Sequence, residues 1–133
     1  MAKVMIFGTF DHFHDGHRFL VNKAREKGSV VVLVAADPTV RMIKGRSPLQ
    51  PLDVRMKTLA SEFPDVRVIP GTTGDFLRPL RVENPDLLLF GYDQRLPPGI
   101  SEKDLEWRWE RAEAFQPEIF KSSLLSRKKG ESD

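Results

Sequence analysis

The chain of 133 residues contains no cysteine, which excludes disulfide bonds and thiol chemistry. It also lacks a long hydrophobic run, because the longest one, Val30 to Ala36, is much too short to span a bilayer. No signal-peptide pattern opens the chain, since Lys3 leads directly into an apolar segment. Together these absences favour a cytoplasmic protein without a membrane partner.

The chain has no strong excess of charge of either sign. Its 21 Lys and Arg residues are nearly balanced by 19 Asp and Glu residues, so the net charge of +2 gives no reason to expect a nucleic-acid partner. The basic residues at 127–129 are followed by Glu131 and Asp133, which favours a solvated, flexible tail over residues 129–133. The length and the hydrophobic content of 40% are typical of one globular domain over residues 1–133.

Short apolar segments alternate with segments of helical periodicity along the chain. We expect strands at 4–7, 30–36, 66–70 and 86–91, and a short fifth strand at 118–120. We expect helices from residue 18 onward and at 51–63, 75–82, 101–115 and 122–128. This alternation predicts an α/β fold, a single Rossmann-like doubly wound domain with a mostly parallel five-stranded sheet.

All three histidines lie in one turn, between the first strand and the first helix. The turn reads Gly8-Thr9-Phe10-Asp11-His12-Phe13-His14-Asp15-Gly16-His17. Backbone N–H groups at a helix N-terminus favour anions, imidazole N–H groups add donors, and Gly16 lets the backbone approach a ligand. The turn therefore predicts a polyphosphate site at His14 and His17. His-x-x-His spacing can also chelate zinc, but without cysteine or an obvious third ligand we predict no dedicated metal site.

Further polar groups follow the other expected strands. Asp37 follows the second strand, Gly91-Tyr92-Asp93-Gln94 follows the fourth, and Ser122-Ser123 follows the expected fifth. In a doubly wound sheet ligands bind beyond the carboxyl ends of the strands, so these groups are expected to meet in one site.

A basic loop precedes the helix at 51–63. It reads Lys44-Gly45-Arg46-Ser47-Pro48, and Arg55 follows inside the helix. Two guanidinium groups and an ammonium group can bind a triphosphate and offset the charge that moves during phosphoryl transfer. Taken alone, the loop is more typical of a solvated basic segment than of a phosphate site.

Together these motifs resemble those of the cytidylyltransferase-like nucleotidyltransferases. The histidine turn matches their G-x-F-D-x-x-H-x-G-H signature. The basic loop with Arg55 resembles their Lys-x-Arg-x-Pro…Arg element, and Ser122 to Arg127 resembles their C-terminal I-S-S-T-x-I-R element. The Asp93-Gln94 pair and the segment Asp37 to Arg41 resemble the archaeal-type FAD synthetases in particular.

The resemblance implies transfer of a nucleoside monophosphate from a nucleoside triphosphate to a phosphorylated small-molecule acceptor, with release of pyrophosphate. It implies catalytic roles for His14, His17, Lys44 and Arg46. It implies nucleotide or phosphate binding by Gly8, Thr9, Phe10, Gly16, Arg55, Gly91, Asp93, Gln94, Ser122, Ser123 and Arg127. It places Asp11 and Asp37 near the acceptor or near Mg²⁺, which would arrive with the nucleotide.

The substrates expected first are ATP and FMN, which would give FAD. The alternative is a CTP-dependent enzyme acting on glycerol-3-phosphate, phosphocholine or a similar phosphate ester. A nucleotide-binding regulatory module is a third reading, favoured by the departures Lys121, Leu124 and Ser126 from the C-terminal element. Relatives are often dimers, and the sequence is compatible with a homodimer.

The flavin ring of FMN would need an apolar or aromatic slot. The aromatic candidates are Phe13, Tyr92, Trp107 and Trp109. The two tryptophans are two residues apart on the expected helix at 101–115, so they should face different directions. We therefore expect one of them in the core and the other at an interface or over the site.

Overall fold

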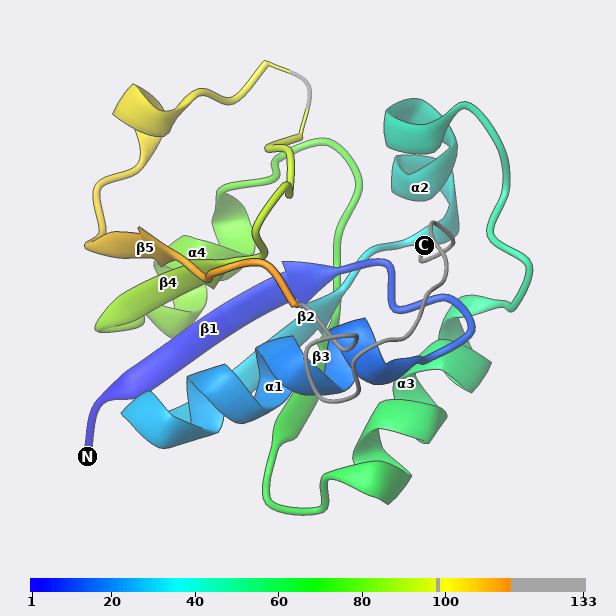
Figure 1. The fold of residues 1–133 in the computed structure, drawn as a ribbon. Coiled ribbons are helices and arrows are strands. Elements are labelled where there is room, and N and C mark those ends of the chain that lie inside the picture. Colours follow the sequence, from blue (N-terminus) through cyan, green and yellow to red (C-terminus); the bar gives the residue numbers. More distant parts are fainter. Residues whose placement is uncertain (98, 116–133) are drawn as a thin grey trace.

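Five parallel strands form the centre of the computed structural model, which describes residues 1–97 and 99–115 (Figure 1). They are β1 (Lys3–Gly8), β2 (Ser29–Val34), β3 (Arg67–Pro70), β4 (Leu87–Phe90) and β5 (Trp109–Arg111). Their order in the sheet is β3-β2-β1-β4-β5, and every neighbouring pair is parallel. The helices are α1 (Asp15–Lys27), α2 (Asp37–Lys44), α3 (Leu52–Glu62) and α4 (Arg78–Glu83), with a 3₁₀ turn at Glu102–Asp104. The α/β doubly wound fold is confirmed.

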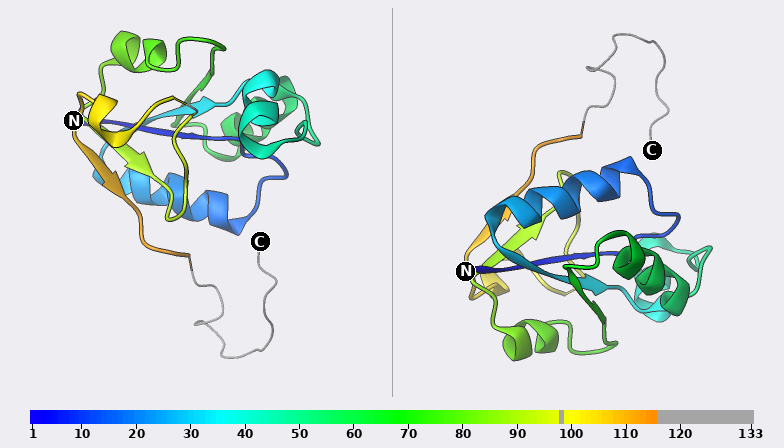
Figure 2. Two further views of the ribbon diagram at one scale, coloured as in Figure 1. Left: turned by 90° about the horizontal axis from the view of Figure 1, so that it is seen from above. Right: turned by 90° about the horizontal axis from the view of Figure 1, so that it is seen from below.

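Both faces of the sheet are apolar because alternate residues of each strand enter different core clusters. In β1, Val4 and Ile6 join the cluster that contains Leu59 and Phe63 from the α3 side, together with α1. Met5 joins the opposite cluster, which contains Leu80 of α4. The two views of Figure 2 show α1 and α4 on opposite sides of the sheet. The fold therefore has three layers, with the sheet in the middle.

The chain reverses direction across the sheet at β1. From β1 it steps to β2 and β3 on one side, and later to β4 and β5 on the other. This is the topological switch point at which open α/β sheets bind ligands, beyond the carboxyl ends of the strands. The histidine turn follows β1 directly, so the fold places it at that point.

The helix expected at 101–115 is wrong. Ser101 does stand at the N-cap of a helical turn, and its backbone N–H donates to the Asp104 carboxylate at 2.8 Å, but the turn ends at Asp104 and the chain then forms β5. From Leu105 to Trp109, apolar and polar residues alternate with the period of two that a strand requires. The fifth strand is therefore at 109–111; the strand expected at 118–120, the helix expected at 122–128 and the tail at 129–133 lie outside the described residues.

The strand geometry also changes the expectation for the tryptophans. Residues two apart on an extended chain point to the same side. Trp107 and Trp109 are both half-buried and both pack on the α4 side of the sheet. Trp107 Nε1 donates to Asn84 Oδ1 at 3.1 Å. Both side chains therefore close one core cluster, and neither lies over the switch point.

The structure also contains one helix that the sequence analysis does not predict, α2, and one helix, α4, that begins later than expected. The helix α2 follows β2 and ends where Gly45 adopts a φ of 76°, a left-handed conformation that favours glycine and stops a helix. α4 begins at Arg78, three residues later than expected. Among the described residues, none of the helices is long and apolar enough to cross a membrane.

Candidate active site

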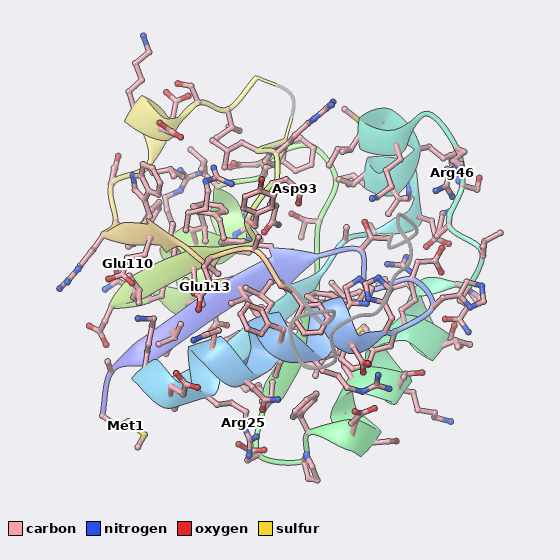
Figure 3. All side chains as sticks on the ribbon, viewed as in Figure 1. Met1, Arg25, Arg46, Asp93, Glu110 and Glu113 are labelled. Atoms are coloured by element: carbon pink, nitrogen blue, oxygen red, sulfur yellow. The ribbon has the colours of Figure 1, made fainter. Side chains whose placement is uncertain are left out.

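A cavity of about 680 Å³ opens at the carboxyl edge of the sheet. Its wall includes residues that follow β1, β2, β3 and β4, so all four strand ends contribute to one space. Its volume is in the range of small-molecule and cofactor sites, on the order of 300–1,000 Å³. Figure 3 shows Asp93 and Arg46 at this end of the molecule, Asp93 on the loop after β4 and Arg46 on the loop after α2.

His14 and His17 form a stacked pair at the start of α1. Their ring centroids are 3.7 Å apart with an interplanar angle of 19°. The His14 backbone N–H donates to His17 Nδ1 at 3.2 Å, and the Gly16 N–H donates to His14 Nδ1 at 3.1 Å. A Cβ on Gly16 would come within 3.0 Å of the His14 ring, so the glycine makes room for this cap. In both imidazoles Nδ1 is the acceptor.

The electrostatics of His17 favour a neutral imidazole. Burial, together with the nearby His14 imidazole and the Lys44 ammonium group, lowers the pKa of His17 to about 4. Because Nδ1 accepts a hydrogen bond, the single proton of the neutral ring is on Nε2. His17 lines the cavity. It can therefore donate a hydrogen bond to a phosphate oxygen without carrying a charge.

Lys44 and Arg46 supply positive charge to the site, and Arg95 on the loop after β4, which the sequence analysis does not single out, adds a third cation to the cavity lining. Lys44 and Arg46 are both exposed, and both line the cavity. Lys44 is the last residue of α2, and Arg46 lies just after the Gly45 turn that ends this helix. The expected cations of the basic loop therefore lie on the same cavity as His17.

Arg55 is placed differently from Lys44 and Arg46, because its side chain has no exposed surface. Its guanidinium group donates to the carbonyl oxygens of Gln50 (2.9 Å), Thr9 (2.8 Å) and Ala35 (2.9 Å). It also donates to Asp37 Oδ1 at 2.5 Å. These partners come from three loops at the edge of the sheet. Arg55 therefore ties those loops together from within the protein, instead of facing a phosphate across the cavity.

Asp11 connects the histidine turn to the segment before α3. Its carboxylate accepts the Leu49 N–H at 2.7 Å and the Gln50 N–H at 2.9 Å. Burial works against ionisation, but these two hydrogen bonds hold the pKa of the Asp11 carboxyl below its usual value. Phe10 and His12, on either side, have positive φ angles of 53° and 49°, which are uncommon for residues other than glycine. The turn is bent at Asp11, whose carboxylate reaches the segment before α3.

Asp93 and Gln94 are adjacent but are placed differently: the Gln94 side chain makes hydrogen bonds within the protein, whereas Asp93 faces solvent at the cavity. The Gln94 amide accepts the Gly91 N–H at 2.9 Å and donates to the Phe7 carbonyl at 2.7 Å, so it joins the ends of β4 and β1. Asp93 is exposed and lines the cavity. Of the two, Asp93 has the carboxylate that a ribose hydroxyl or a base amino group can reach.

The sequence-predicted residues fall into three groups. Those that line the cavity are Gly8, Thr9, Phe10, His17, Lys44, Arg46, Asp93 and Gln94. Those that do not line it but make hydrogen bonds within the loops around it are Asp11, His14, Gly16, Asp37, Arg55 and Gly91. Ser122, Ser123 and Arg127 lie outside the described residues.

The aromatic side chains proposed for a flavin slot are elsewhere. Phe13 packs against Phe63 with ring centroids 6.1 Å apart, Tyr92 is 62% exposed, and the two tryptophans close the core cluster described above. The apolar cavity wall instead comes from segments that the sequence reading left without a role. They include Leu33, Ala35, Ala36, Ile43, Phe76 and Leu77. Their position at or just after the ends of two strands, β2 and β3, is the sequence feature that could have identified them, because ligands bind at that edge of the sheet.

Comparison with known proteins identifies the family. A family model described as cytidylyltransferase-like matches residues 5–116. The chain is 36% identical over 118 residues to a FAD synthase from Methanococcoides burtonii, covering 87% of this chain and 80% of that protein. It is 38% identical over 115 residues to a FAD synthase from Methanopyrus kandleri, covering 83% and 73%.

A solved structure agrees with this assignment. The lipopolysaccharide core biosynthesis protein from Thermoplasma volcanium superposes with a TM-score of 0.75 at 28% identity, covering 87% of this chain and 99% of that chain. The family model matches most of the chain and includes the histidine turn and the cavity lining. The protein therefore belongs to the cytidylyltransferase-like family and is a nucleotidyltransferase.

Proposed function

We propose that the protein is an FMN adenylyltransferase, which transfers AMP from ATP to the phosphate of FMN and releases pyrophosphate. The observation that carries this proposal is the composition of the cavity. It combines a neutral imidazole donor and three cations, Lys44, Arg46 and Arg95, with an apolar wall after β2 and β3. The similarity to two FAD synthases supports the same substrates.

The reaction is an in-line displacement at the α-phosphorus of ATP. An oxygen of the FMN phosphate forms the new P–O bond, the bond to the bridging oxygen of the β-phosphate breaks, and pyrophosphate leaves with the electron pair. The FMN phosphate is already ionised, so no general base is needed. Catalysis then depends on positioning and on charge stabilisation.

Each phosphate-binding group has a distinct part. His17 Nε2–H donates to the α-phosphate oxygens, where negative charge builds up in the transition state. His14 fixes the start of α1 and the orientation of His17 through their stacked rings. Lys44 and Arg46 offset the charge of the triphosphate and of the leaving pyrophosphate.

The residues of the site fit a magnesium ion that arrives with ATP. The two carboxylates that the sequence suggests for it, Asp11 and Asp37, already have partners, since Asp11 accepts hydrogen bonds from two backbone N–H groups and Asp37 accepts one from the Arg55 guanidinium group. Among the described residues, no group of three or more His, Asp or Glu side chains gathers as a metal site. Lys44 and Arg46 would hold the phosphates to which Mg²⁺ is bound, and the ion would supply further charge neutralisation there.

The test crosses nucleotides with acceptors. Purified protein with Mg²⁺ is incubated with ATP or CTP, each combined with FMN, glycerol-3-phosphate, phosphocholine or phosphopantetheine, and pyrophosphate is measured. Release with ATP and FMN alone is the expected result. Release only with CTP would make the protein a cytidylyltransferase, and no release with any pair would favour a nucleotide-binding module.

A further inference from the structure

Arg111, the last residue of the edge strand β5, binds the loop that follows β4. Its Nη1 atom donates to the carbonyl oxygen of Gly91 at 3.0 Å and to that of Gln94 at 2.9 Å. These two residues are the first and the last of the loop 91–94. Hydrogen bonds from a charged donor are stronger than those between neutral groups. Arg111 is not part of the cavity lining, so it can act on the site only through this loop.

The parallel pairing of β4 and β5 explains why Arg111 reaches the loop. Arg111 pairs with Phe90, the last residue of β4, and the Ala112 N–H donates to the Phe90 carbonyl at 2.8 Å. The guanidinium carbon lies 5.6 Å from the centroid of the Phe90 ring, and Nη2 lies 3.9 Å from a carboxylate oxygen of Glu102. The guanidinium group is therefore held on several sides, next to the point where the loop begins.

The loop 91–94 is also tied to β1. The Gln94 side chain accepts the Gly91 N–H at 2.9 Å and donates to the Phe7 carbonyl at 2.7 Å, and the Gln94 backbone N–H donates to the Gly91 carbonyl at 3.2 Å. With the two bonds from Arg111, the backbone N–H and carbonyl groups of Gly91 and Gln94 all have partners. Both ends of the loop are thus fixed, one support coming from β1 and the other from β5.

This fixed loop carries polar side chains of the cavity. Asp93 lies between its two ends and Arg95 follows it directly, and both are exposed and line the cavity. An exposed side chain on a loose loop must be ordered when a ligand binds, and that ordering reduces affinity. A loop whose backbone is already held avoids most of this cost. The affinity of the site for the ligand that Asp93 contacts should therefore depend on Arg111.

We propose that Arg111 is a positioning residue for the nucleotide: by fixing the loop 91–94 it holds the Asp93 carboxylate where it contacts the nucleoside of ATP. This proposal rests on the proposed function, because it takes ATP as the nucleotide and Asp93 as one of its contacts. It adds a residue from outside the cavity to those that determine ATP affinity, and it gives the short edge strand β5 a part in binding.

The test uses Arg111→Met, which removes the donors but keeps a long apolar stem beside Phe90. Dissociation constants for ATP with Mg²⁺ are measured by calorimetry, and steady-state kinetics are measured with ATP and FMN. We expect ATP to bind about tenfold more weakly, and KM for ATP to rise by a similar factor. Because the FMN side of the cavity does not depend on this loop, kcat at saturating ATP and KM for FMN should change by less than about twofold.

Two further variants serve as controls. A single nitrogen of Arg111 makes both hydrogen bonds, and a lysine ammonium group has three donors, so Arg111→Lys should recover most of the ATP affinity. Arg108→Met makes the same change just before β5. The Arg108 side chain is 78% exposed and lies 3.7 Å from the Glu110 carboxylate, with no bond to the loop, so this variant should bind ATP like the wild type.

Amide hydrogen exchange without ligand separates local positioning from a general loss of stability. In Arg111→Met the amides of Gly91 and Gln94 should exchange faster, because their partners belong to the loosened loop, whereas the amides of β1 and β2 should be unaffected. A double-mutant cycle tests the route through Asp93. In an Asp93→Asn background, Arg111→Met should weaken ATP binding by less than about twofold, since the contact that it positions is already lost.

The outcomes separate this proposal from the proposed function. If the wild type does not bind ATP, the proposed function fails and this proposal fails with it. If the wild type binds ATP and Arg111→Met binds it equally well, this proposal alone is overturned. It is also overturned if Arg111→Met weakens ATP binding by the same factor with and without Asp93→Asn. Faster exchange throughout the sheet, with weaker binding of both ATP and FMN, would show that Arg111 only stabilises the fold and would overturn it as well.

Discussion

His17 Nδ1 accepts the backbone N–H of His14 at 3.2 Å, while the two imidazole rings stack with their centroids 3.7 Å apart. The first residue of the motif thus orients the second. This hydrogen bond settles which nitrogen of His17 carries the proton, and the lowered pKa keeps the ring neutral. The H-x-G-H spacing is therefore both a helix cap and a means of aiming one N–H group into the cavity.

Replacement of His17 by alanine should lower kcat by about 100- to 1,000-fold, the usual cost of removing one donor from a developing anion. His12, the remaining histidine of the turn, offers a matched control. His12 is exposed, and asparagine tolerates its positive φ, so His12→Asn should retain nearly full activity. Steady-state kinetics with ATP and FMN would measure both variants. Full activity of His17→Ala would remove it from the phosphate site.

The lowered pKa of His17 predicts a dependence of stability on pH. In the unfolded chain the imidazole takes up a proton below about pH 6.5, whereas in the folded protein it stays neutral down to about pH 4. The unfolded state therefore binds more protons in this window, and stability contributed by His17 falls as the pH drops from 6.5 to 4.

Urea unfolding of wild type and His17→Gln at several pH values isolates this effect. The difference between their unfolding free energies should shrink as the pH falls through the window, and then level off below about pH 4. The lowered pKa of Asp11 acts at still lower pH and is common to both proteins. A difference that does not change with pH would contradict the neutral, buried state of His17.

Replacement by leucine should mainly lower stability at Arg55 and mainly weaken ATP binding at Arg46. Arg55→Leu leaves three carbonyl groups and the Asp37 carboxylate without their donor, so it should lower the free energy of unfolding by about 3–5 kcal/mol. Arg46→Leu changes an exposed residue and should alter stability by less than about 0.5 kcal/mol while raising KM for ATP. Chemical denaturation and kinetics separate the two. A stable Arg55→Leu protein with only a raised KM would restore Arg55 to direct phosphate binding.

Asp93 and Gln94 are adjacent, yet their replacements should have different effects. Gln94→Leu leaves the Gly91 N–H and the Phe7 carbonyl unpaired, which should cost about 1–3 kcal/mol for each buried group. Asp93→Asn should leave stability unchanged and weaken ATP binding. Calorimetric titration with ATP and thermal unfolding measure the two effects. Equal ATP affinity for Asp93→Asn and the wild type would place the nucleoside away from this loop.

The fold could be predicted where one periodicity governs a segment. The strands at 4–7 and 86–91 and the helix at 51–63 have apolar patterns that leave one interpretation, and the structure confirms each within a few residues. The helix expected at 101–115 is wrong because Ser101 stands at the N-cap of a single helical turn, whereas the period-two alternation from Leu105 to Trp109 is that of a strand. The sequence analysis does not predict α2, although Pro38 near its start and Gly45 at its end are typical helix boundaries.

The site could be predicted only as far as its charges and strand ends. Sequence motifs bring His17, Lys44, Arg46 and Asp93 to the same edge of the sheet, and the structure places all four on one cavity. The burial of Arg55 could not be predicted, because it depends on carbonyl groups that three separate loops bring together. Such a meeting of carbonyl groups exists only in the folded chain.

Adenylyl transfer to FMN is tested most directly by following the phosphorus atoms of ATP. The protein is incubated with FMN, Mg²⁺ and ATP radiolabelled at either the α- or the γ-phosphorus, and the products are separated by chromatography. The α label should appear in a product that co-migrates with FAD, and the γ label in pyrophosphate. Transfer of the γ label to the acceptor, or an α label that never reaches a flavin product, would contradict the account.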